Sequence, residues 1–394
     1  MRPVVIVRYS EIAVKGPATR RRMETLLARN IREALRSLGA GGDVVRADGR
    51  ILIRSPSPDE YTVARACTRV FGVKSSSPAV EFEFSSLEEI VEKATEWFGP
   101  RVKGKVFRVR ARRAGSHAFT SMDVERLVGA SLLEVGGARV NLESPEYTAY
   151  IEIRGNRAYL FDEILEGPGG LPLGSEGPVM VLFSGGFDST AAAWLLMRRG
   201  ARIALTYYDL GVAEALERAL SVALSLARNW SYGYKIKVYR VDFSDVASKV
   251  RSLVDRRYRV LVLRRAMLEH AARLAIDEGY EALATGDNVG QVASQTIRNL
   301  MLIGRSLPLP VLRPLAGSDK DEVVALVRRI GLYDEASKQV EVCGRASSPT
   351  PHADPVIFER EYSKLGFDPS IVRVHSAEVS RDLSLRGLLE LLGG

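Results

Sequence analysis

The sequence contains only two cysteines, Cys67 and Cys343, in 394 residues. Two thiols exclude a disulfide framework, and they exclude a zinc site or an iron–sulfur cluster built only from the cysteines of one chain. Such low cysteine usage is typical of a reducing compartment, so we expect a cytoplasmic protein. Cys67 lies in an apolar helical pattern, which indicates a core position rather than a reactive one.

The chain also lacks any apolar run of about 18 residues, the minimum for a membrane-spanning helix, so we expect no membrane partner. The opening Met1–Val7 is too short for a signal peptide and predicts a first β-strand. Hydrophobic residues still make up 46% of the chain, enough for the cores of two or three domains. The four histidines stand in no metal-binding or catalytic spacing, and we expect them on the surface: His117, His270, His352 and His375.

Acidic residues are fewer than basic ones, 48 against 56, and the net charge of +8 favours an anionic partner. Residues 101–113 hold seven cations and no anion. Like charges at this density repel one another unless a polyanion neutralises them, so we interpret the stretch as a nucleic-acid contact. The alternative is a solvated sheet edge. The predicted nucleic-acid contacts are Lys103, Lys105, Arg108, Arg110, Arg112, Arg113 and His117.

The most informative motif is Val179–Thr190, which reads VMVLFSGGFDST. Its apolar residues predict a buried parallel strand, Ser184–Gly186 predicts a tight turn, and Ser189–Arg199 predicts a helix. A strand, a glycine turn and a helix N-terminus form an anion site, because backbone N–H groups point at the anion. No Walker loop occurs in the chain. The Ser-Gly-Gly-x-Asp-Ser pattern resembles the pyrophosphate loop of ATP pyrophosphatases; the alternative is a glycine turn without a ligand.

Composition shifts along the chain predict its domains. We expect an α/β domain over 1–60, a second α/β domain over 61–166, a Gly- and Pro-rich linker over 167–178, and a third domain over 179–394 with a helical tail. In the third domain strands alternate with helices, which predicts a doubly wound parallel sheet. Ligands bind at the carboxyl ends of such strands. Those ends carry Ser184–Asp188, Tyr207–Tyr208 and Thr285–Asp287.

Further motifs make the resemblance specific. Residues 284–300 (ATGDNVGQVASQTIRNL), residues 310–320 (PVLRPLAGSDK) and Cys343-Gly344, taken with the pyrophosphate loop, resemble the tRNA 4-thiouridine synthetases, also called the tRNA sulfurtransferases of thiamine biosynthesis. Tyr9–Gly16 is similar to the opening signature of that family, and residues 70–78 and 107–125 are similar to its THUMP domain. The resemblance covers residues from about 5 to 352 in order.

The resemblance implies an α/β fold in three domains: an N-terminal ferredoxin-like domain, a THUMP RNA-binding domain and a pyrophosphate-loop ATP pyrophosphatase domain of the adenine nucleotide alpha hydrolase type. The first two would hold the acceptor arm of tRNA. The third would use ATP and Mg²⁺ to adenylate O4 of the uridine at position 8, and sulfur would then displace AMP. Adenylation converts a poor leaving group, the carbonyl oxygen, into a good one.

Matching positions imply the roles of single residues. Asp188 would serve the pyrophosphate and its metal, and Cys343 would be the nucleophile. Lys338 and Arg345 flank Cys343 with positive charge, which favours a thiolate. Lys320, at a turn into a helix, is assigned to phosphate. The predicted nucleotide contacts are Leu182, Phe183, Ser184, Gly185, Gly186, Ser189, Thr190, Tyr207, Tyr208, Arg264, Gly286, Gln295 and Lys320.

Several alternatives stay open at this point. We expect no C-terminal rhodanese-like domain, so the sulfur donor is either a cysteine desulfurase acting through Cys343 or inorganic sulfide. A homodimer is compatible with the sequence. Another pyrophosphate-loop enzyme, such as an amidating synthetase or a tRNA lysidine-type ligase, needs no nucleophilic cysteine. A nucleic-acid-binding protein with an inactive nucleotide site is the remaining class.

Overall fold

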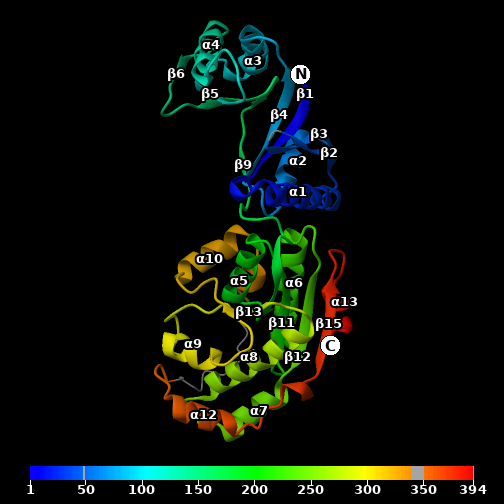
Figure 1. The fold of residues 1–394 in the computed structure, drawn as a ribbon, viewed down its shortest axis with the longest axis vertical. Helices are drawn as coiled ribbons and strands as arrows, with labels where there is room; N and C mark the ends of the chain where they lie inside the picture. Colours follow the sequence, from blue (N-terminus) through cyan, green and yellow to red (C-terminus); the bar gives the residue numbers. More distant parts are fainter. Residues whose placement is uncertain (48, 339–349, 394) are drawn as a thin grey trace. The chain divides into compact units, whose positions relative to one another are not determined.

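The computed structural model describes residues 1–47, 49–338 and 350–393. The chain divides into two compact units, Met1–Pro172 (unit 1) and Leu173–Gly394 (unit 2), each built on its own β-sheet (Figure 1). None of the helices in the described part of the chain combines the length and the apolarity that crossing a bilayer requires.

Unit 1 is a nine-stranded sheet with four α-helices among its described residues. Its elements are β1 (Arg2–Arg8), η1 (Glu11–Val14), α1 (Pro17–Ser37), β2 (Gly41–Ala47), β3 (Arg50–Ser57), α2 (Glu60–Cys67), β4 (Ser75–Glu83), α3 (Leu87–Val102), β5 (Val106–Ala114), α4 (Ser121–Glu134), β6 (Arg139–Val140), β7 (Tyr147–Arg154), β8 (Arg157–Phe161) and β9 (Leu165–Glu166). The strand order is β2-β3-β1-β4-β8-β7-β5-β6, and β9 pairs with β4. β5 runs parallel to β6 and β7.

Local sequence signals fix where the helices of unit 1 begin. Pro17 is the first residue of α1, where a missing N–H costs no hydrogen bond. The Asp59 side chain caps α2 by accepting the Thr62 N–H at 2.8 Å. Thr120 and Asp123 form a reciprocal capping box at the start of α4. Cys67, at the end of α2, is fully buried, as predicted, and burial raises the pKa of its thiol to about 12.

A small apolar core lies against one set of these strands, and it includes Val4, Ile6, Leu52 and Phe161.

Two buried carboxylates lie near opposite ends of β1: Glu81 is opposite Arg2 in the β1–β4 register, and Glu152 binds Arg8. The Glu152 carboxylate forms ion pairs with the guanidinium Nε atoms of three arginines: Arg8 at 3.1 Å, Arg50 at 2.9 Å and Arg154 at 2.7 Å. Burial opposes the ionisation of Glu152, but the three arginines outweigh it and lower its pKa.

Unit 2 has a six-stranded sheet in the order β14-β13-β10-β11-β12-β15. The elements are β10 (Glu176–Leu182), α5 (Phe187–Arg198), β11 (Ala201–Asp209), α6 (Ala213–Trp230), β12 (Ile236–Asp242), α7 (Ser244–Leu253), α8 (Arg259–Asp277), β13 (Ala282–Ala284), η2 (Ala293–Gln295), α9 (Ile297–Gly304), β14 (Val311–Leu312), α10 (Lys320–Arg329), α11 (Tyr333–Ala336), α12 (Pro355–Ser363), η3 (Pro369–Ile371), β15 (Val374–Val379) and α13 (Leu385–Leu391). The first five strands of this order pair in parallel, which confirms the predicted doubly wound sheet.

The strand order places a topological switch point beside β10. From β10 the chain moves to β11 and β12 on one side, and it then returns to pair β13 with the other side of β10. Since crossovers between parallel strands are right-handed, α5 and α6 cover one face of the sheet and α7 and α8 the other (Figure 1). The carboxyl ends of β10, β11 and β13 therefore border one crevice, where open α/β sheets bind ligands.

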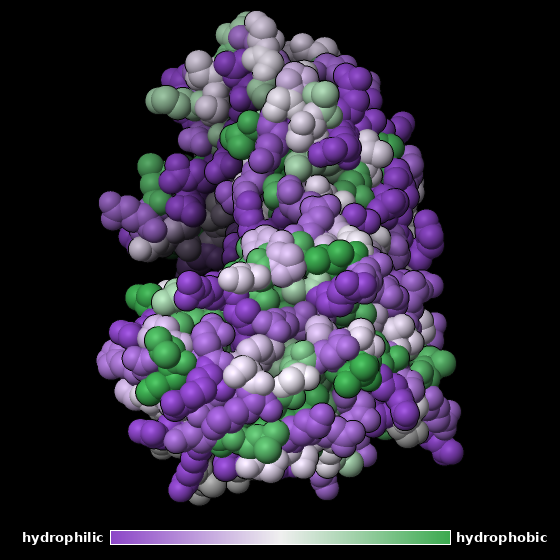
Figure 2. Space-filling model, turned by 60° about the horizontal axis from the view of Figure 1, so that its bottom comes forward, coloured by the Kyte–Doolittle hydropathy of each residue, from purple (hydrophilic) through white to green (hydrophobic). Residues whose placement is uncertain are grey.

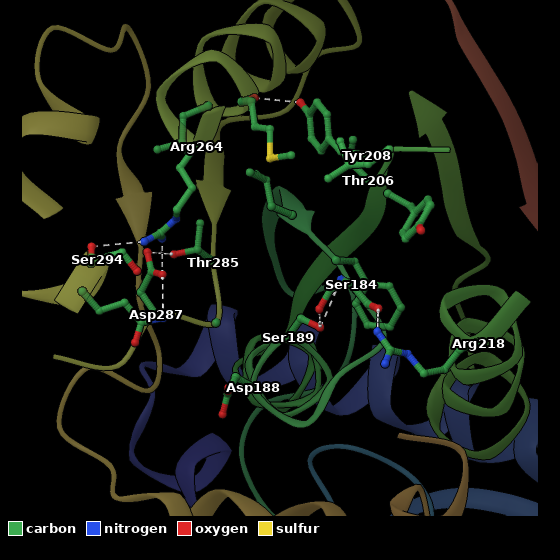
Figure 3. Close-up of a pocket in the computed structure, with 18 residues that line it drawn as sticks. Ser184, Asp188, Ser189, Thr206, Tyr208, Arg218, Arg264, Thr285, Asp287 and Ser294 are labelled. Atoms are coloured by element: carbon green, nitrogen blue, oxygen red, sulfur yellow. Dashed lines mark hydrogen bonds and ion pairs between the residues drawn. The ribbon is translucent and has the colours of Figure 1, made fainter. Parts of the chain in front are cut away.

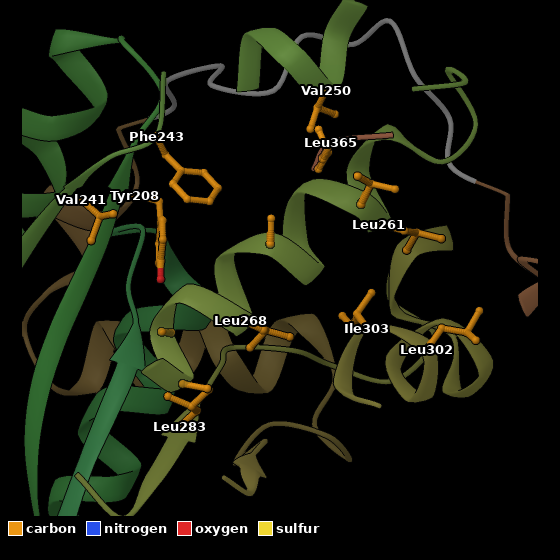
Figure 4. Packing of buried hydrophobic residues seen from close by; sticks show 14 of the residues in the cluster. Tyr208, Val241, Phe243, Val250, Leu261, Leu268, Leu283, Leu302, Ile303 and Leu365 are labelled. Carbon is orange, nitrogen blue, oxygen red and sulfur yellow. The ribbon is translucent and has the colours of Figure 1, made fainter. Parts of the chain in front are cut away.

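The core under α8 reaches the wall of this crevice. It packs strand residues such as Tyr208 and Leu283 against Leu268 of α8 and Ile303 of α9 (Figure 4). His270 of α8 is 3% exposed and lies edge-on to Tyr208, so its predicted surface position is wrong. The prediction rested on the polarity of one residue, whereas a helix face of apolar neighbours decides its burial. On the face in Figure 2, hydrophobic side chains form small groups among hydrophilic ones.

Two predictions about regular structure need correction. The tail beyond Asp354 is not helical throughout, because β15 lies between α12 and α13 and pairs antiparallel with β12. Its six residues are too few to show a clear strand period. β10 begins at Glu176, so the last residues of the expected linker 167–178 belong to the sheet. The expected boundaries at residues 60 and 166 stay predictions.

Candidate functional site

A pocket of about 390 Å³ opens at the carboxyl ends of β10, β11 and β13 (Figure 3). Its wall combines apolar side chains with a few polar ones, as in small-molecule sites. The lining residues are Leu182, Phe183, Ser184, Asp188, Ser189, Thr206, Tyr207, Tyr208, Leu210, Arg218, Arg264, Met267, Leu268, Thr285, Gly286, Asp287, Ser294 and Gln295.

The loop after β10 turns directly into α5. Gly186 is the N-cap of α5, and the first N–H groups of a helix have no acceptor inside the helix. The Ser189 hydroxyl accepts the Ser184 N–H at 3.2 Å and donates to the Gly186 carbonyl at 3.2 Å. These bonds hold the loop in a turn around the helix N-terminus, where the helix dipole favours an anion.

Two glycines permit close backbone contacts that hold this loop. Gly185 has φ +73°, and a Cβ there would lie 2.6 Å from the Cα of Ala219 in α6. Gly286 passes α5 so closely that a Cβ would lie 2.6 Å from the carbonyl carbon of Asp188 and 2.7 Å from the Ser189 nitrogen. Any side chain at either position would push the loop away from its neighbour.

Asp188, on the first turn of α5, faces the start of α10. Its carboxylate accepts hydrogen bonds from Lys320 Nζ at 3.0 and 3.2 Å. Lys320 is the first residue of α10, after a capping box made by Asp319 and Glu322, so the predicted turn into a helix is confirmed. Both side chains are partly exposed, 29% for Asp188 and 47% for Lys320. The ammonium group is therefore accessible to an incoming anion.

The two tyrosines at the end of β11 differ in environment. Tyr208 donates to the Met267 carbonyl at 2.7 Å and contacts His270 Nδ1 at 3.0 Å, so its ring is fixed in the wall. Burial lowers the pKa of His270 to about 4, which keeps the imidazole neutral. The Tyr207 hydroxyl is buried without a partner among the described residues. Burial, followed by the charge of Asp209, raises the pKa of Tyr207 to about 12.

On the opposite wall, Asp287 accepts hydrogen bonds from several elements. Its carboxylate is paired with the Arg264 guanidinium, accepts the Thr285 hydroxyl at 2.8 Å, and lies 3.4 Å from Gln295 Nε2 (Figure 3). Arg313 Nε also lies 3.4 Å from it. Arg264 also donates to the Ser294 carbonyl at 3.3 Å. In the wall, the buried Asp287 carboxylate thus pairs with Arg264, which lines the pocket, and with Arg313 behind it.

Sequence reasoning missed Arg218 as a pocket residue. Its guanidinium donates to the Ser184 carbonyl at 3.1 Å and to the Lys338 carbonyl at 2.8 Å. Burial lowers the pKa of Arg218. Arg218 lies in the middle of α6, far from any motif, and no sequence signal marks it. Asp287 was noted at a strand end but given no role, although its position beside Gly286 could have indicated one.

The pocket gathers most of the predicted nucleotide residues. Gly185, Gly186 and Thr190 belong to the same loop and helix but do not line the pocket, and Thr190 is fully buried. Lys320 reaches the site through Asp188. Cys343 lies outside the described residues. The predicted residues that line the pocket are Leu182, Phe183, Ser184, Asp188, Ser189, Tyr207, Tyr208, Arg264, Gly286 and Gln295.

The predicted nucleic-acid contacts divide between two faces of β5. Phe107 and Val109 point into the core, so Arg108, Arg110 and Arg112 alternate onto the other face. Arg110 and Arg112 are exposed, whereas Arg108 donates to the Thr148 hydroxyl at 3.1 Å and the Leu142 carbonyl at 3.0 Å.

The remaining cations lie off this arginine face: Arg113 is near the end of β5 on the alternate side, and Lys103, Lys105 and His117 flank the strand. Arg113 donates to the Gly115 carbonyl and approaches His117 Nδ1 at 3.0 Å. His117 Nε2 in turn lies 2.7 Å from the Gly155 carbonyl. Lys103 and Lys105 are exposed before the strand, and Lys105 lies 5.4 Å from the centre of the Tyr147 ring. The side-chain alternation of β5 thus places the predicted basic residues in two groups, one on a face of the sheet and the other at the flanks of the strand.

Comparisons with known proteins agree with this architecture. The family model described as thiamine biosynthesis protein (ThiI) matches residues 174–367. The ThiI ferredoxin-like domain matches residues 4–77, and the THUMP domain matches residues 84–163.

Relatives match over most of the chain. A probable tRNA sulfurtransferase of Aeropyrum pernix is 56% identical over 98% of this chain and 99% of its own length. A tRNA sulfurtransferase of Pyrobaculum aerophilum is 44% identical over 86% of this chain and 69% of its own length. The crystal structure of a 4-thiouridine synthetase in complex with RNA and bound ATP superposes with a TM-score of 0.79 at 28% identity, over 96% of this chain and 100% of that chain.

Proposed function

Because this chain belongs to the thiamine biosynthesis protein (ThiI) family of tRNA sulfurtransferases, we propose that it uses ATP to transfer sulfur to tRNA and forms 4-thiouridine at position 8. One observation carries the proposal: the pyrophosphate loop, Asp188 with its bound Lys320, and Arg264 come together at one pocket at the switch point of the sheet, where Asp188 and Arg264 line the pocket and Lys320 reaches it through Asp188. A related 4-thiouridine synthetase holds ATP in its structure.

We infer that the loop binds the phosphates of ATP and that the tyrosine wall binds its adenosine. The N–H groups at the start of α5 and the Lys320 ammonium favour an anion at this end of the pocket. Tyr208, fixed by Met267 and His270, offers a flat ring beside the nucleoside.

Asp188 fits a role as a ligand of the Mg²⁺ that accompanies ATP. Within the described residues no three His, Cys, Asp or Glu side chains gather into a metal site. A phosphate-bound Mg²⁺ needs only one or two carboxylates, the other ligands being water and phosphate oxygens. Bound there, the metal would supply charge that offsets the phosphates. Lys320 would then be released from Asp188 to contact a phosphate oxygen.

The chemistry proceeds in two displacements. O4 of the uridine attacks the α-phosphorus of ATP, the bond to the β-phosphate oxygen breaks, and pyrophosphate leaves. A sulfur nucleophile then adds at C4, the C4–O4 bond breaks, and AMP leaves. We assign the sulfur to inorganic sulfide, which adds at C4 directly, or to a persulfide on Cys343 that a cysteine desulfurase loads. Attack by the persulfide joins C4 to Cys343 through a disulfide, so an external dithiol, present in the assay, must reduce that S–S bond to release 4-thiouridine and the Cys343 thiol.

The tRNA contacts are assigned to unit 1. The exposed cations of β5 are suited to phosphate groups, and a THUMP domain covers residues 84–163. We expect the acceptor arm to be the part of tRNA that is bound. A tRNA-modifying reaction suits the cytoplasm, and a homodimer stays a prediction.

A thiolation assay tests the proposal. Purified protein, ATP–Mg and an unmodified tRNA transcript are incubated with sulfide alone, or with a cysteine desulfurase and cysteine, and the nucleosides are analysed for 4-thiouridine. We expect thiolation in at least one arm. Asp188→Asn should abolish AMP formation while tRNA affinity is retained. Asp277→Asn, an exposed carboxylate on α8, is the matched control.

The outcomes separate the alternative functions. If Cys343→Ser abolishes thiolation with the desulfurase but not with sulfide, Cys343 carries the sulfur. AMP formation without thiolated base in either arm would favour another pyrophosphate-loop enzyme. No ATP turnover in the presence of tRNA would favour a nucleic-acid-binding protein with an inactive nucleotide site.

A further inference from the structure

We propose that Asp287 is a positioning residue for the nucleotide, which holds Arg264 and Gln295 in the orientation in which they contact ATP. The inference rests on the proposed ATP site and assigns a role to a side chain that neither the motif nor the matching positions had given one. Asp287 lines the pocket and is 3% exposed.

The contacts of Asp287 use both of its carboxylate oxygens. Oδ1 accepts hydrogen bonds from Arg264 of α8 and Gln295 of η2. Oδ2 accepts the hydrogen bond of the Thr285 hydroxyl and lies 3.4 Å from Nε of Arg313, just after β14. These partners come from four separate segments of unit 2. A carboxylate that joins four segments in a pocket wall fixes the position of each side chain that it binds.

Asp287 also decides which way the Gln295 amide faces. A carboxylate only accepts hydrogen bonds, so the amide must turn its NH₂ group toward Asp287. The Gln295 oxygen is then buried without a partner among the described residues. Since a buried acceptor without a donor costs free energy, the site is suited to an N–H or O–H donor of the nucleoside. That donor is the adenine 6-amino group or a ribose hydroxyl.

The charge of Asp287 has a second effect on the wall. Arg264 and Arg313 would repel each other if no carboxylate lay between them. With Asp287 present, Arg264 is held against the Ser294 carbonyl on one side and the carboxylate on the other. Gly286, the preceding residue, packs against the backbone of Asp188, so the same strand end contacts the phosphate loop.

Asp287→Asn is the direct test, because it keeps the shape and removes the charge. With its oxygen toward Arg264 and Gln295, the Asn amide turns its NH₂ group toward Thr285 and Arg313, so the negative charge between the two arginines is lost and Arg264 is held only by a neutral acceptor. In AMP formation at saturating tRNA, we expect the KM for ATP to rise about tenfold and kcat to change less than threefold. Pyrophosphate carries no nucleoside, so its inhibition constant should stay within about twofold of the wild-type value.

Glu152→Gln is the matched control. Glu152 is also 3% exposed and bound to arginines, but it lies in unit 1 outside the pocket. Its substitution should leave the KM for ATP unchanged. Equal KM shifts in the two variants would mean that loss of a buried ion pair, and not the pocket wall, is measured, and the inference would be wrong.

A second test does not depend on the folding of the Asp287 variant. Wild type and Gln295→Leu are compared with ATP, 2′-deoxy-ATP, 3′-deoxy-ATP and purine riboside triphosphate, which lacks the 6-amino group. One of these analogues lacks the donor that Gln295 contacts. With the wild type, kcat/KM for that analogue should be about tenfold lower than for ATP, whereas with Gln295→Leu the two values should be equal. The analogue that gives this result identifies the donor.

The results separate this inference from the proposed function. If the wild type uses ATP and Asp287→Asn shows an unchanged KM, or if every analogue loses the same factor with both proteins, the inference is overturned and the proposed function stands. If the wild type forms no AMP from ATP, both are overturned.

Discussion

Two buried carboxylates, one in each unit, show how the same ionic chemistry serves different ends. Glu152 in unit 1 and Asp287 in unit 2 are each 3% exposed and each paired with more than one arginine. The partners of Glu152 lie on β1, β3 and β7, so the network joins strands of one sheet. The partners of Asp287 include two side chains that line the pocket, Arg264 and Gln295.

The difference follows from where each carboxylate lies in its sheet. Glu152 is inside β7, with neighbours on both sides, and Arg8 next to it is packed on the Phe161 ring at 4.6 Å. Asp287 lies just beyond the end of β13, where a parallel sheet leaves a crevice. A buried ion pair within a strand holds the fold together, whereas one beyond a strand end can shape a binding site.

The largest expected effect comes from Glu152→Ala. It removes a carboxylate that compensates buried guanidinium groups and should lower the free energy of unfolding by about 3 to 5 kcal/mol. Urea denaturation of the full chain measures the loss, and the KM for ATP should not change. A loss below about 1 kcal/mol would mean that water replaces the carboxylate, and the contrast between the two sites would weaken.

Gly185→Ala tests the opposite side of the comparison, because it perturbs unit 2 alone. A Cβ at φ +73° and 2.6 Å from Ala219 forces the loop off α6. AMP formation should fall about a hundredfold, close to 3 kcal/mol, while tRNA affinity is retained. Gly317→Ala, where a Cβ meets no atom within 4 Å, is the control. Equal activity in both variants would show that the loop does not need its contact with α6.

Replacement of Arg110, Arg112 and Arg113 by alanine should affect unit 1 alone. We expect weaker tRNA binding and a salt dependence that is flatter by about one unit of slope for each lost phosphate contact. Electrophoretic mobility shifts at several salt concentrations measure both. The control removes three exposed cations of unit 2: Lys235, Arg251 and Arg386. If both triple variants lose the same affinity, net charge and not β5 is responsible.

At neutral pH the smallest effect concerns His270 behind the pocket wall, because its contribution to stability changes only as the pH falls. Its pKa is lowered to about 4 in the folded protein, while the unfolded chain has the usual value near 6.5. Between these pH values only the unfolded chain binds the proton, so stability falls as the pH falls, by up to about 1.4 kcal/mol per pH unit. His270→Asn should have a flatter stability profile from pH 6.5 to 4. Parallel profiles would show that other groups control it.

The sequence predicted the parts that strong local patterns encode. The β10 loop with its glycines and the Lys320 helix start were predicted because strand, turn and capping signals lie within a few residues of one another. Tyr207 and Tyr208 were placed at a strand end by the same alternation of patterns.

The rest depends on contacts between distant segments. Arg218 reaches the loop from the middle of α6. The role of Asp287 depends on partners from α8, η2 and the residues after β14, which only the folded chain brings to it. His270 is polar in sequence, and only the packing of α8 shows that it is buried. β15 was missed because its six residues show no clear strand period, and the partner that makes it a strand, β12, lies more than 130 residues earlier in the chain.

β15 has a consequence for solubility. β12 would otherwise present unpaired backbone N–H and C=O groups along seven residues, a template on which a second chain could grow. β15 covers that template and is itself short, with Ser376 and Glu378 exposed to water. A charged side chain on a brief outer strand discourages further pairing between molecules. The last strand of the sheet thus protects the enzyme against aggregation at the concentrations at which it must work.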